Sequence, residues 1–193
     1  MAKREEKREH VLQAAKVVLE NYGIRKLTLD DVAEKAGLAT PSLYYYFKNK
    51  RELVRAVVKA EIDEITSQID SAISETDGPE GKIKAIATIL YDHANRLAAL
   101  PGMNRMEHAA VFPDIAKDVE VGRKRIRTLM EQIIEEGNAA GIFDVAYSSK
   151  AALMLSIGLV GMMETAINGE MPKNAKNDMD YMMELLFNGF RKR

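Results

Sequence analysis

The segment from residue 27 to residue 52 constrains the fold of this chain more than any other feature, because it contains two helix starts and a helix stop. Thr28 is suited to cap a short helix whose first turn holds two aspartates, since carboxylates stabilise the positive end of a helix dipole. Gly37 can end this helix, and Thr40 and Pro41 can begin a second one soon after. Two short helices joined by so tight a turn predict a helix-turn-helix unit.

The charge of this segment indicates what the second helix faces. Residues 35–51 contain four basic residues and no Asp or Glu, which suits a polyanion. We expect Asn49 to cap the next helix, with Lys50 in its first turn, where the dipole disfavours a cation unless a phosphate offsets the cost. Three consecutive tyrosines, residues 44–46, spread over about 200° of a helix, so at least one should face outward, where it could contact a phosphate or a thymine methyl. The alternative is plain packing, because helix-turn-helix geometry and aromatic clusters also occur in ordinary cores.

Composition separates the N-terminal part of the chain from the remainder. Residues 1–60 hold 13 Lys and Arg against 8 Asp and Glu, whereas residues 61–193 hold 15 against 21. This asymmetry is expected if only the N-terminal part meets nucleic acid. The absence of cysteine excludes disulfides and thiolate sites, and the first ten residues are too polar for a signal peptide, so we expect a cytoplasmic protein.

Every segment with a clear hydrophobic period is helical, which predicts an all-α fold of about nine helices. Residues 50–74 form one long amphipathic helix, and residues 75–81 are a polar break rich in Gly and Pro. Residues 151–163 carry no charge and are apolar all round, which predicts burial on more than one face. They are too few to span a bilayer, for which about 20 residues are needed, so no membrane is expected as a partner.

A resemblance sharpens these expectations. The run from Leu43 to Leu53, together with Leu27–Ala33 and the pair Ala36-Gly37, resembles the DNA-binding domain of the TetR family of repressors, and the match covers residues 4 to about 55. The resemblance implies a helix-turn-helix DNA-binding domain in residues 1–50, linked through the helix 50–74 to a helical effector-binding and dimerisation domain in residues 51–193.

The same resemblance implies the residues that contact DNA. Thr40 and Pro41 would approach base edges, and Tyr44 and Tyr45 would contact bases or the sugar-phosphate backbone. Phosphates would be bound by Thr28, Ser42, Tyr46 and Lys50, while Leu43 and Phe47 would be core. Asp30 departs from the family, because some members place a basic residue there that contacts a base. The operator sequence therefore cannot be transferred from a relative.

The last two helices are predicted to form a dimer interface. As in the family, each would pair with its symmetry mate in a four-helix bundle, giving a C2 homodimer that matches a palindromic operator in double-stranded DNA. The alternative is that both helices fill the core of the monomer. The predicted interface residues are Met154, Gly158, Gly161, Met162, Met179, Met182, Met183, Leu186 and Phe190.

A family-like mechanism would place a small-molecule effector among the helices that follow residue 81, and its binding would shift the protein towards a state that releases DNA. Flexible methionines and aromatic side chains adapt to apolar molecules, which favours an apolar or amphipathic effector, although each could also be ordinary core. The candidate lining residues are Tyr91, Met103, Met106, Phe112, Met130 and Met162. Arg96, Arg105 and His108 could anchor a polar or acidic head group, and a protein partner remains an alternative.

Catalysis has little support in the sequence. The three histidines, residues 10, 93 and 108, lack metal-ligand spacing, and no nucleophile motif or glycine-rich phosphate loop is present. We therefore expect no cofactor, no metal and no enzymatic activity. The predicted function is that of a sequence-specific transcriptional regulator, a repressor released from its operator by an effector. A non-specific architectural DNA-binding protein and an enzyme with an unrecognised site are the alternatives.

Overall fold

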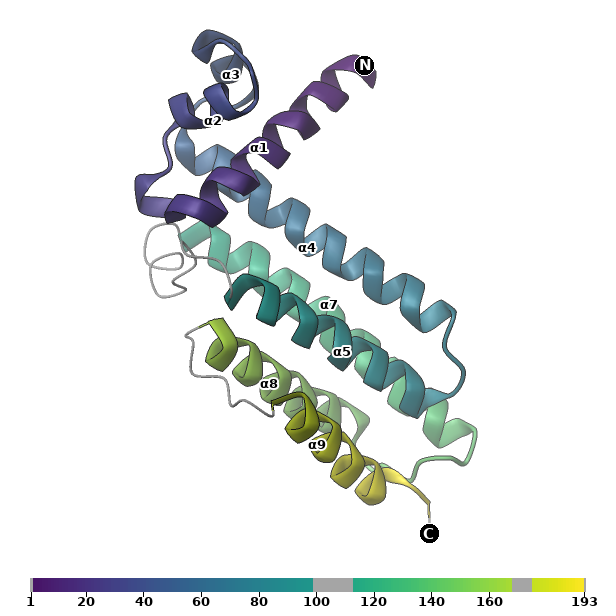
Figure 1. The fold of residues 1–193 in the computed structure, drawn as a ribbon. Helices are drawn as coiled ribbons and strands as arrows, with labels where there is room; N and C mark the ends of the chain where they lie inside the picture. Colours follow the sequence, from purple (N-terminus) through teal and green to yellow (C-terminus); the bar gives the residue numbers. More distant parts are fainter. Residues whose placement is uncertain (1, 99–112, 168–174, 193) are drawn as a thin grey trace. The chain divides into compact units, whose positions relative to one another are not determined.

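The computed structural model describes residues 2–98, 113–167 and 175–192, and these ranges contain eight helices and no strand (Figure 1). The all-α prediction is confirmed, and the predicted start of the long helix at residue 50 and its end at residue 74 agree with the structure. The helices are α1 (Ala2–Lys26), α2 (Leu29–Lys35), α3 (Thr40–Tyr46), α4 (Lys50–Ser74), α5 (Pro79–Ala98), α7 (Pro113–Ala139), α8 (Ser148–Ile167) and α9 (Ala175–Phe190).

The chain divides into two compact units, one made of residues 1–63 and 97–119 and the other of residues 64–96 and 120–193. The first unit is larger than the predicted DNA-binding domain of residues 1–50. The reason is that Leu53 of α4 and Ile115 of α7 are buried in the same hydrophobic cluster as the helix-turn-helix residues. Both α4 and α7 therefore contribute residues to each unit.

In the first unit, α1 supplies one wall of the core and α2, α3 and the start of α4 supply the others. Val11, Val32 and Leu43, one residue from each of the first three helices, are fully buried. The turn after α2 is a Schellman motif, in which the Leu38 amide donates to the Ala33 carbonyl at 2.9 Å. Local backbone hydrogen bonds thus set the angle at which α3 leaves α2.

The second unit has one core to which α4, α5, α7, α8 and α9 all contribute. Phe143, in the connection between α7 and α8, is buried and lies over α9. Its ring stacks on Phe187 with the centroids 6.3 Å apart and meets Phe190 edge-on at 5.8 Å. A Cβ atom added at Gly137 would lie 2.3 Å from the Phe143 ring, so this corner requires glycine in the last turns of α7.

Within the part of the chain that the structure describes, no helix is both long enough and apolar enough to cross a lipid bilayer.

Candidate DNA-binding site

The start of α2 is held by a capping box. The Asp31 amide donates to Thr28 Oγ1 at 3.1 Å, and the Thr28 amide donates to Asp31 Oδ2 at 3.1 Å. The predicted cap at Thr28 is confirmed. The Thr28 hydroxyl also donates to Asp31 Oδ2 at 2.6 Å. Its hydrogen is thus already used, and a hydrogen bond from this hydroxyl to a phosphate would have to replace the bond to Asp31.

The start of α3 differs from the prediction by one residue. The cap is Ala39, which makes no side-chain capping hydrogen bond, and Thr40 is the first residue of the helix. The prediction that Thr40 caps α3 is therefore wrong, because the backbone already turns into the helix at this position. Thr40 is half-buried, whereas the next two residues, Pro41 and Ser42, are exposed at the head of α3.

The three tyrosines of α3 separate as their helical spacing requires. Tyr44 is 49% exposed and Tyr45 is 65% exposed, whereas Tyr46 is half-buried and packs against the core. The prediction that at least one tyrosine faces outward is confirmed. Leu43 and Phe47, four positions apart on the opposite side, are fully buried, as predicted. One face of α3 thus anchors the helix and the other presents two phenols.

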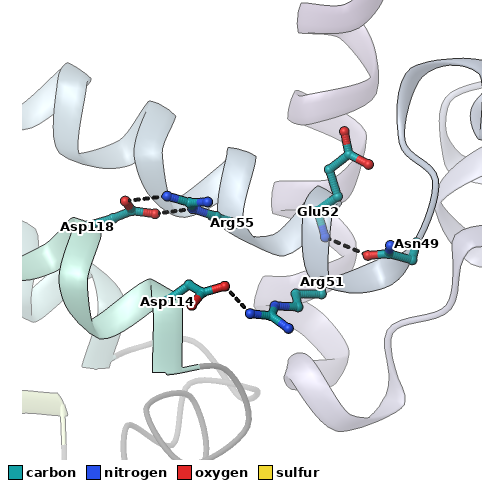
Figure 2. A network of polar contacts seen from close by, with 6 residues as sticks. All are labelled: Asn49, Arg51, Glu52, Arg55, Asp114 and Asp118. Atoms are coloured by element: carbon teal, nitrogen blue, oxygen red, sulfur yellow. Dashed lines mark hydrogen bonds and ion pairs between the residues drawn. The ribbon is translucent and has the colours of Figure 1, made fainter.

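The start of α4 contains the predicted capping arrangement and an additional contact. Asn49 Oδ1 accepts from the Glu52 amide at 2.9 Å, a bond drawn in Figure 2. The Lys50 ammonium donates to the carbonyl of Arg25 at 2.9 Å, at the end of α1, and partial burial lowers the pKa of Lys50. This carbonyl offsets the unfavourable position of the Lys50 charge at the start of α4, which a phosphate had been expected to do, and the bond connects α4 to α1.

Two further basic residues of α4 are paired with α7 inside the first unit. Arg51 extends towards Asp114, and Arg55 forms a two-pronged ion pair with Asp118 at 2.5 and 2.9 Å (Figure 2). The hydrogen bonds from these arginines hold the pKa of Asp114 and of Asp118 below its ordinary value. Arg51 belongs to the acid-free segment of the sequence, yet its partner is a carboxylate of this chain.

The N-terminal half of α1 contributes residues that the sequence interpretation missed. The Arg4 guanidinium lies 5.1 Å from the centroid of the Tyr45 ring, and that of Arg8 lies 5.2 Å from the Phe47 ring. Arg4 and Arg8 are one helical turn apart and share a face. Their i, i+4 spacing was visible in the sequence, but nothing local indicated that this face meets α3.

The predicted effector residues lie in part within the described second unit. Met130 is fully buried in its core, and Tyr91 and Met162 are half-buried against that core. Arg96 Nη2 lies 2.8 Å from Nδ1 of His93, a buried histidine that the prediction did not include. The other predicted positions, Met103, Arg105, Met106, His108 and Phe112, lie outside the described residues.

The predicted interface residues of α9 mostly face inward. Met179 and Met183 are 2% and 1% exposed and belong to the core of their own unit, so little of either side chain is left for contact with a partner. The others, Met182, Leu186 and Phe190, are half-buried against the same core, as is Met162 of α8. The apolar stripe of α9 thus packs against the core of its own unit.

The exposed apolar side of α8 and α9 is made of other residues. On α8, Met154 is 60% exposed, as expected of an interface residue, and Ile157 is 55% exposed. Gly158 and Gly161 follow on α8, and a Cβ atom added at either would meet nothing within 4 Å. On α9, Tyr181 and Leu185 are 63% and 55% exposed. We call Met154, Ile157, Gly161, Tyr181 and Leu185 the outer face; only the first and third were predicted.

Comparisons with known proteins agree with this architecture. Residues 11–57 match the family described as bacterial regulatory proteins, tetR family. The chain is 24% identical over 159 residues to the HTH-type transcriptional activator FasR of Mycolicibacterium smegmatis, an alignment that covers 82% of this chain and 69% of FasR. It is 25% identical over 151 residues to the HTH-type transcriptional repressor KstR2 of the same species, over 71% of this chain and 67% of KstR2.

The fold extends this likeness beyond the helix-turn-helix. The crystal structure of the transcriptional regulator FadR from Bacillus subtilis in complex with stearoyl-CoA superposes with a TM-score of 0.70, covering 94% of this chain and 98% of FadR at 18% identity. The exposed phenols of α3 lie in the segment that matches the family. Taken with the helix-turn-helix geometry, the match of residues 11–57 shows that the chain contains the DNA-binding domain of the TetR family of transcriptional regulators.

Proposed function

We propose that this regulator is a repressor that binds a palindromic operator as a homodimer in the cytoplasm and leaves it when a small apolar or amphipathic effector binds. The observation that carries the DNA-binding part is the exposed head and outer side of α3. There Pro41, Ser42, Tyr44 and Tyr45 are exposed within a segment that contains no acidic residue. Hydroxyls, phenols and an uncharged helix start can approach a phosphate backbone without charge repulsion.

The set of DNA-contacting residues that we propose is narrower than the resemblance implied. It comprises Thr40, Pro41, Ser42, Tyr44 and Tyr45, with Tyr46 supporting them from its half-buried position. Thr28 is left out of this set, because a phosphate would have to replace the hydrogen bond from its hydroxyl to Asp31. Lys50 retains two further N–H donors beyond its bond to Arg25, so it can hold the end of α1 and still approach a phosphate.

The effector class is supported by the second unit. Tyr91 and Met162 line the margin of an apolar core that is built largely from Ile, Leu, Met and Phe. The pair formed by His93 and Arg96 adds a cationic group that could meet an acidic head. FadR of B. subtilis binds stearoyl-CoA, a molecule with an apolar tail and an anionic head. We therefore propose an acyl thioester or a related amphipathic acid. Enzymatic turnover of that molecule forms no part of the proposal.

Repression is proposed by analogy with the repressor among the relatives. KstR2 is named a repressor and FasR an activator. A repressor and an activator of this family need the same DNA-binding surface. Whether the protein represses or activates a gene therefore depends on where the operator lies relative to the promoter. A reporter gene placed behind the selected operator would settle it: expression should rise when the regulator is deleted.

The decisive test is selection of bound duplexes from a random DNA library at near-physiological salt. We expect an enriched palindrome, and we expect Tyr45→Ala to lower the ratio of specific to non-specific affinity by about tenfold or more, because a lost base contact costs about 1–3 kcal/mol. Tyr22→Ala is the matched control, since Tyr22 is also an exposed tyrosine of the first unit but lies on α1. A pool without a preferred sequence would refute sequence-specific binding, and equal losses for both variants would refute the proposed contact of Tyr45 with DNA.

The dimer is tested separately through the outer face of α8 and α9. A partner copy would bury Leu185 and Met154, two large apolar side chains that are exposed in the single chain. Monomeric proteins seldom expose large apolar patches. We expect Leu185→Glu to convert a dimer into a monomer in sedimentation at micromolar concentration. Val121→Glu, on the exposed side of α7 in the same unit, should leave the dimer intact. A wild-type protein that sediments only as a monomer would contradict the proposal.

A further inference from the structure

Two arginines on one face of α1 lie over two aromatic rings from the end of α3. The Arg4 guanidinium is 5.1 Å from the Tyr45 centroid, and the Arg8 guanidinium is 5.2 Å from the Phe47 centroid. Both distances are within the range at which a cation is attracted to the face of an aromatic ring. The two pairs repeat at a spacing of four residues on α1 and two residues on α3 and its cap.

The two pairs differ in what surrounds the ring. Phe47 is 1% exposed, so Arg8 covers a core side chain and holds α1 against α3. Tyr45 is 65% exposed and lies on the side of α3 that faces solvent. Arg4 is itself exposed. The Arg8 contact is therefore part of the core, whereas the Arg4 contact sits on the surface proposed to meet DNA.

The Tyr45 ring is restrained from two directions. Arg4 lies near its face, and Tyr46 meets it in a T-shaped contact with the centroids 5.3 Å apart and an interplanar angle of 87°. A side chain that is already ordered loses less conformational entropy on binding than one that rotates freely. Stacking also occupies only the flat face of a guanidinium, so the N–H groups at its edge can still donate to an anion.

We propose that Arg4 is a positioning and DNA-contacting residue: it orients Tyr45 for contact with the operator and donates to an adjacent phosphate, so that the N-terminal turns of α1 form part of the DNA interface. This inference rests on the proposed function, because it assumes that Tyr45 contacts DNA specifically. It adds α1 to an interface that otherwise consists of α3 and Lys50 of α4. Of the three glutamates of this region, Glu5 and Glu9 are each offset by about 100° from the arginine before them, and Glu6 lies about 160° from both arginines.

The test is a double-mutant cycle of Arg4→Gln and Tyr45→Leu, measured as affinity for the selected palindrome and for a scrambled duplex. Arg4→Gln should lower the ratio of the two affinities about two- to fivefold, the size of an exposed cation–π contact. It should also weaken binding to both duplexes and reduce the salt slope by about one. In the Tyr45→Leu background, the same change should leave the ratio unaltered, because the ring on which Arg4 acts is gone.

Two further variants separate positioning from charge and from folding. Lys7→Gln removes one positive charge from the same turns of α1 and should weaken binding to both duplexes equally. Arg4→Lys should recover part of the ratio, since an ammonium also attracts an aromatic face. The urea midpoint of Arg4→Gln should match that of the wild type, because both Arg4 and Tyr45 are exposed.

The possible failures point to different conclusions. A ratio that Arg4→Gln leaves unchanged, in a wild-type protein that prefers the palindrome, would overturn this inference and leave the proposed function standing. The same conclusion would follow if the losses in this ratio caused by Arg4→Gln and by Tyr45→Leu were fully additive in the double variant. A wild-type protein without any sequence preference would overturn the proposed function and this inference together.

Discussion

The turn after α2 and the corner after α7 are both built around a glycine, but for opposite reasons. Gly37 has a φ of 65°, in the left-handed region, and a Cβ atom there would meet nothing within 4 Å. Gly137 has helical neighbours, and a Cβ atom there would lie 2.3 Å from the Phe143 ring. Gly37 is needed because its own backbone adopts a left-handed conformation, whereas Gly137 is needed because a side chain six residues further along occupies the space of a Cβ atom. A sequence pattern can predict a glycine required by the backbone of a turn, but it cannot predict one required by a tertiary contact.

The largest effect is expected at the corner. Gly137→Ala should lower the free energy of unfolding by about 1–3 kcal/mol, because the Phe143 ring would have to shift from its contacts with Phe187 and Phe190, a cost that outweighs the better helix propensity of alanine. Urea unfolding measures the change. Gly189→Ala is the matched control, since that helical glycine of α9 has nothing within 4 Å of a Cβ atom. A neutral or stabilising Gly137→Ala would show that the ring is free to move.

A smaller effect is expected at the turn. Gly37→Ala should cost about 1–2 kcal/mol, because an L-residue at this φ brings its Cβ atom against its own backbone. Gly37→Asn should cost less, since asparagine tolerates the left-handed region. Equal losses for the two substitutions would indicate that space, and not backbone conformation, demands the glycine. Thermal unfolding at one fixed pH measures both variants.

The smallest effect is expected where α7 meets α4 within the first unit. The ion pairs of Arg51 with Asp114 and of Arg55 with Asp118 lie at the surface, so Asp118→Asn should change stability by less than about 1 kcal/mol at pH 7. Because the pKa of Asp118 is lowered in the folded protein, its contribution is complete above the ordinary aspartate pKa of about 3.9 and is lost as the pH falls through the lowered value.

Urea unfolding at pH 7 and at pH 3 therefore tests the pairing. The difference between wild type and Asp118→Asn should be smaller at pH 3, since the carboxylate is then partly protonated in the unfolded chain. Asp180→Asn, at an exposed position of α9, controls for the loss of one carboxylate. A difference that grows towards low pH would have the wrong sign and would contradict the ion pair.

The helix-turn-helix was predictable because its signals are local. The Thr28 cap, the stop at Gly37 and the cap at Asn49 each depend on residues within five positions of one another. The register of α3 followed from helical spacing, which places Leu43 and Phe47 inside and Tyr44 and Tyr45 outside. The start of α3 was predicted one residue too late. Thr40 is a favourable capping residue type, but the helix begins at Thr40 and its cap is Ala39, which makes no side-chain hydrogen bond.

The outer face of α8 and α9 was harder to predict, because both helices carry apolar residues on more than one side. The stripe that runs through Met179 and Met183 was the more regular one, and it fills the core of the unit. Tyr181 and Leu185 looked like incidental surface residues in the sequence. Only the packing of five helices around one core decides which of two apolar sides is left outside.

The sequence by itself determined the helical class, the ends of α2 and the start of α4 in the DNA-binding segment, and the chemistry available for contact with DNA. These depend on dihedral preferences, caps and spacing within one or two turns. The tertiary structure alone decided the partners of the charged residues: Lys50 meets a carbonyl 25 positions away, and Arg55 meets a carboxylate 63 positions away. It likewise placed Arg4 over Tyr45. Such contacts have no local signal, because the separation of two residues along the chain does not fix their separation in space until every intervening helix has packed.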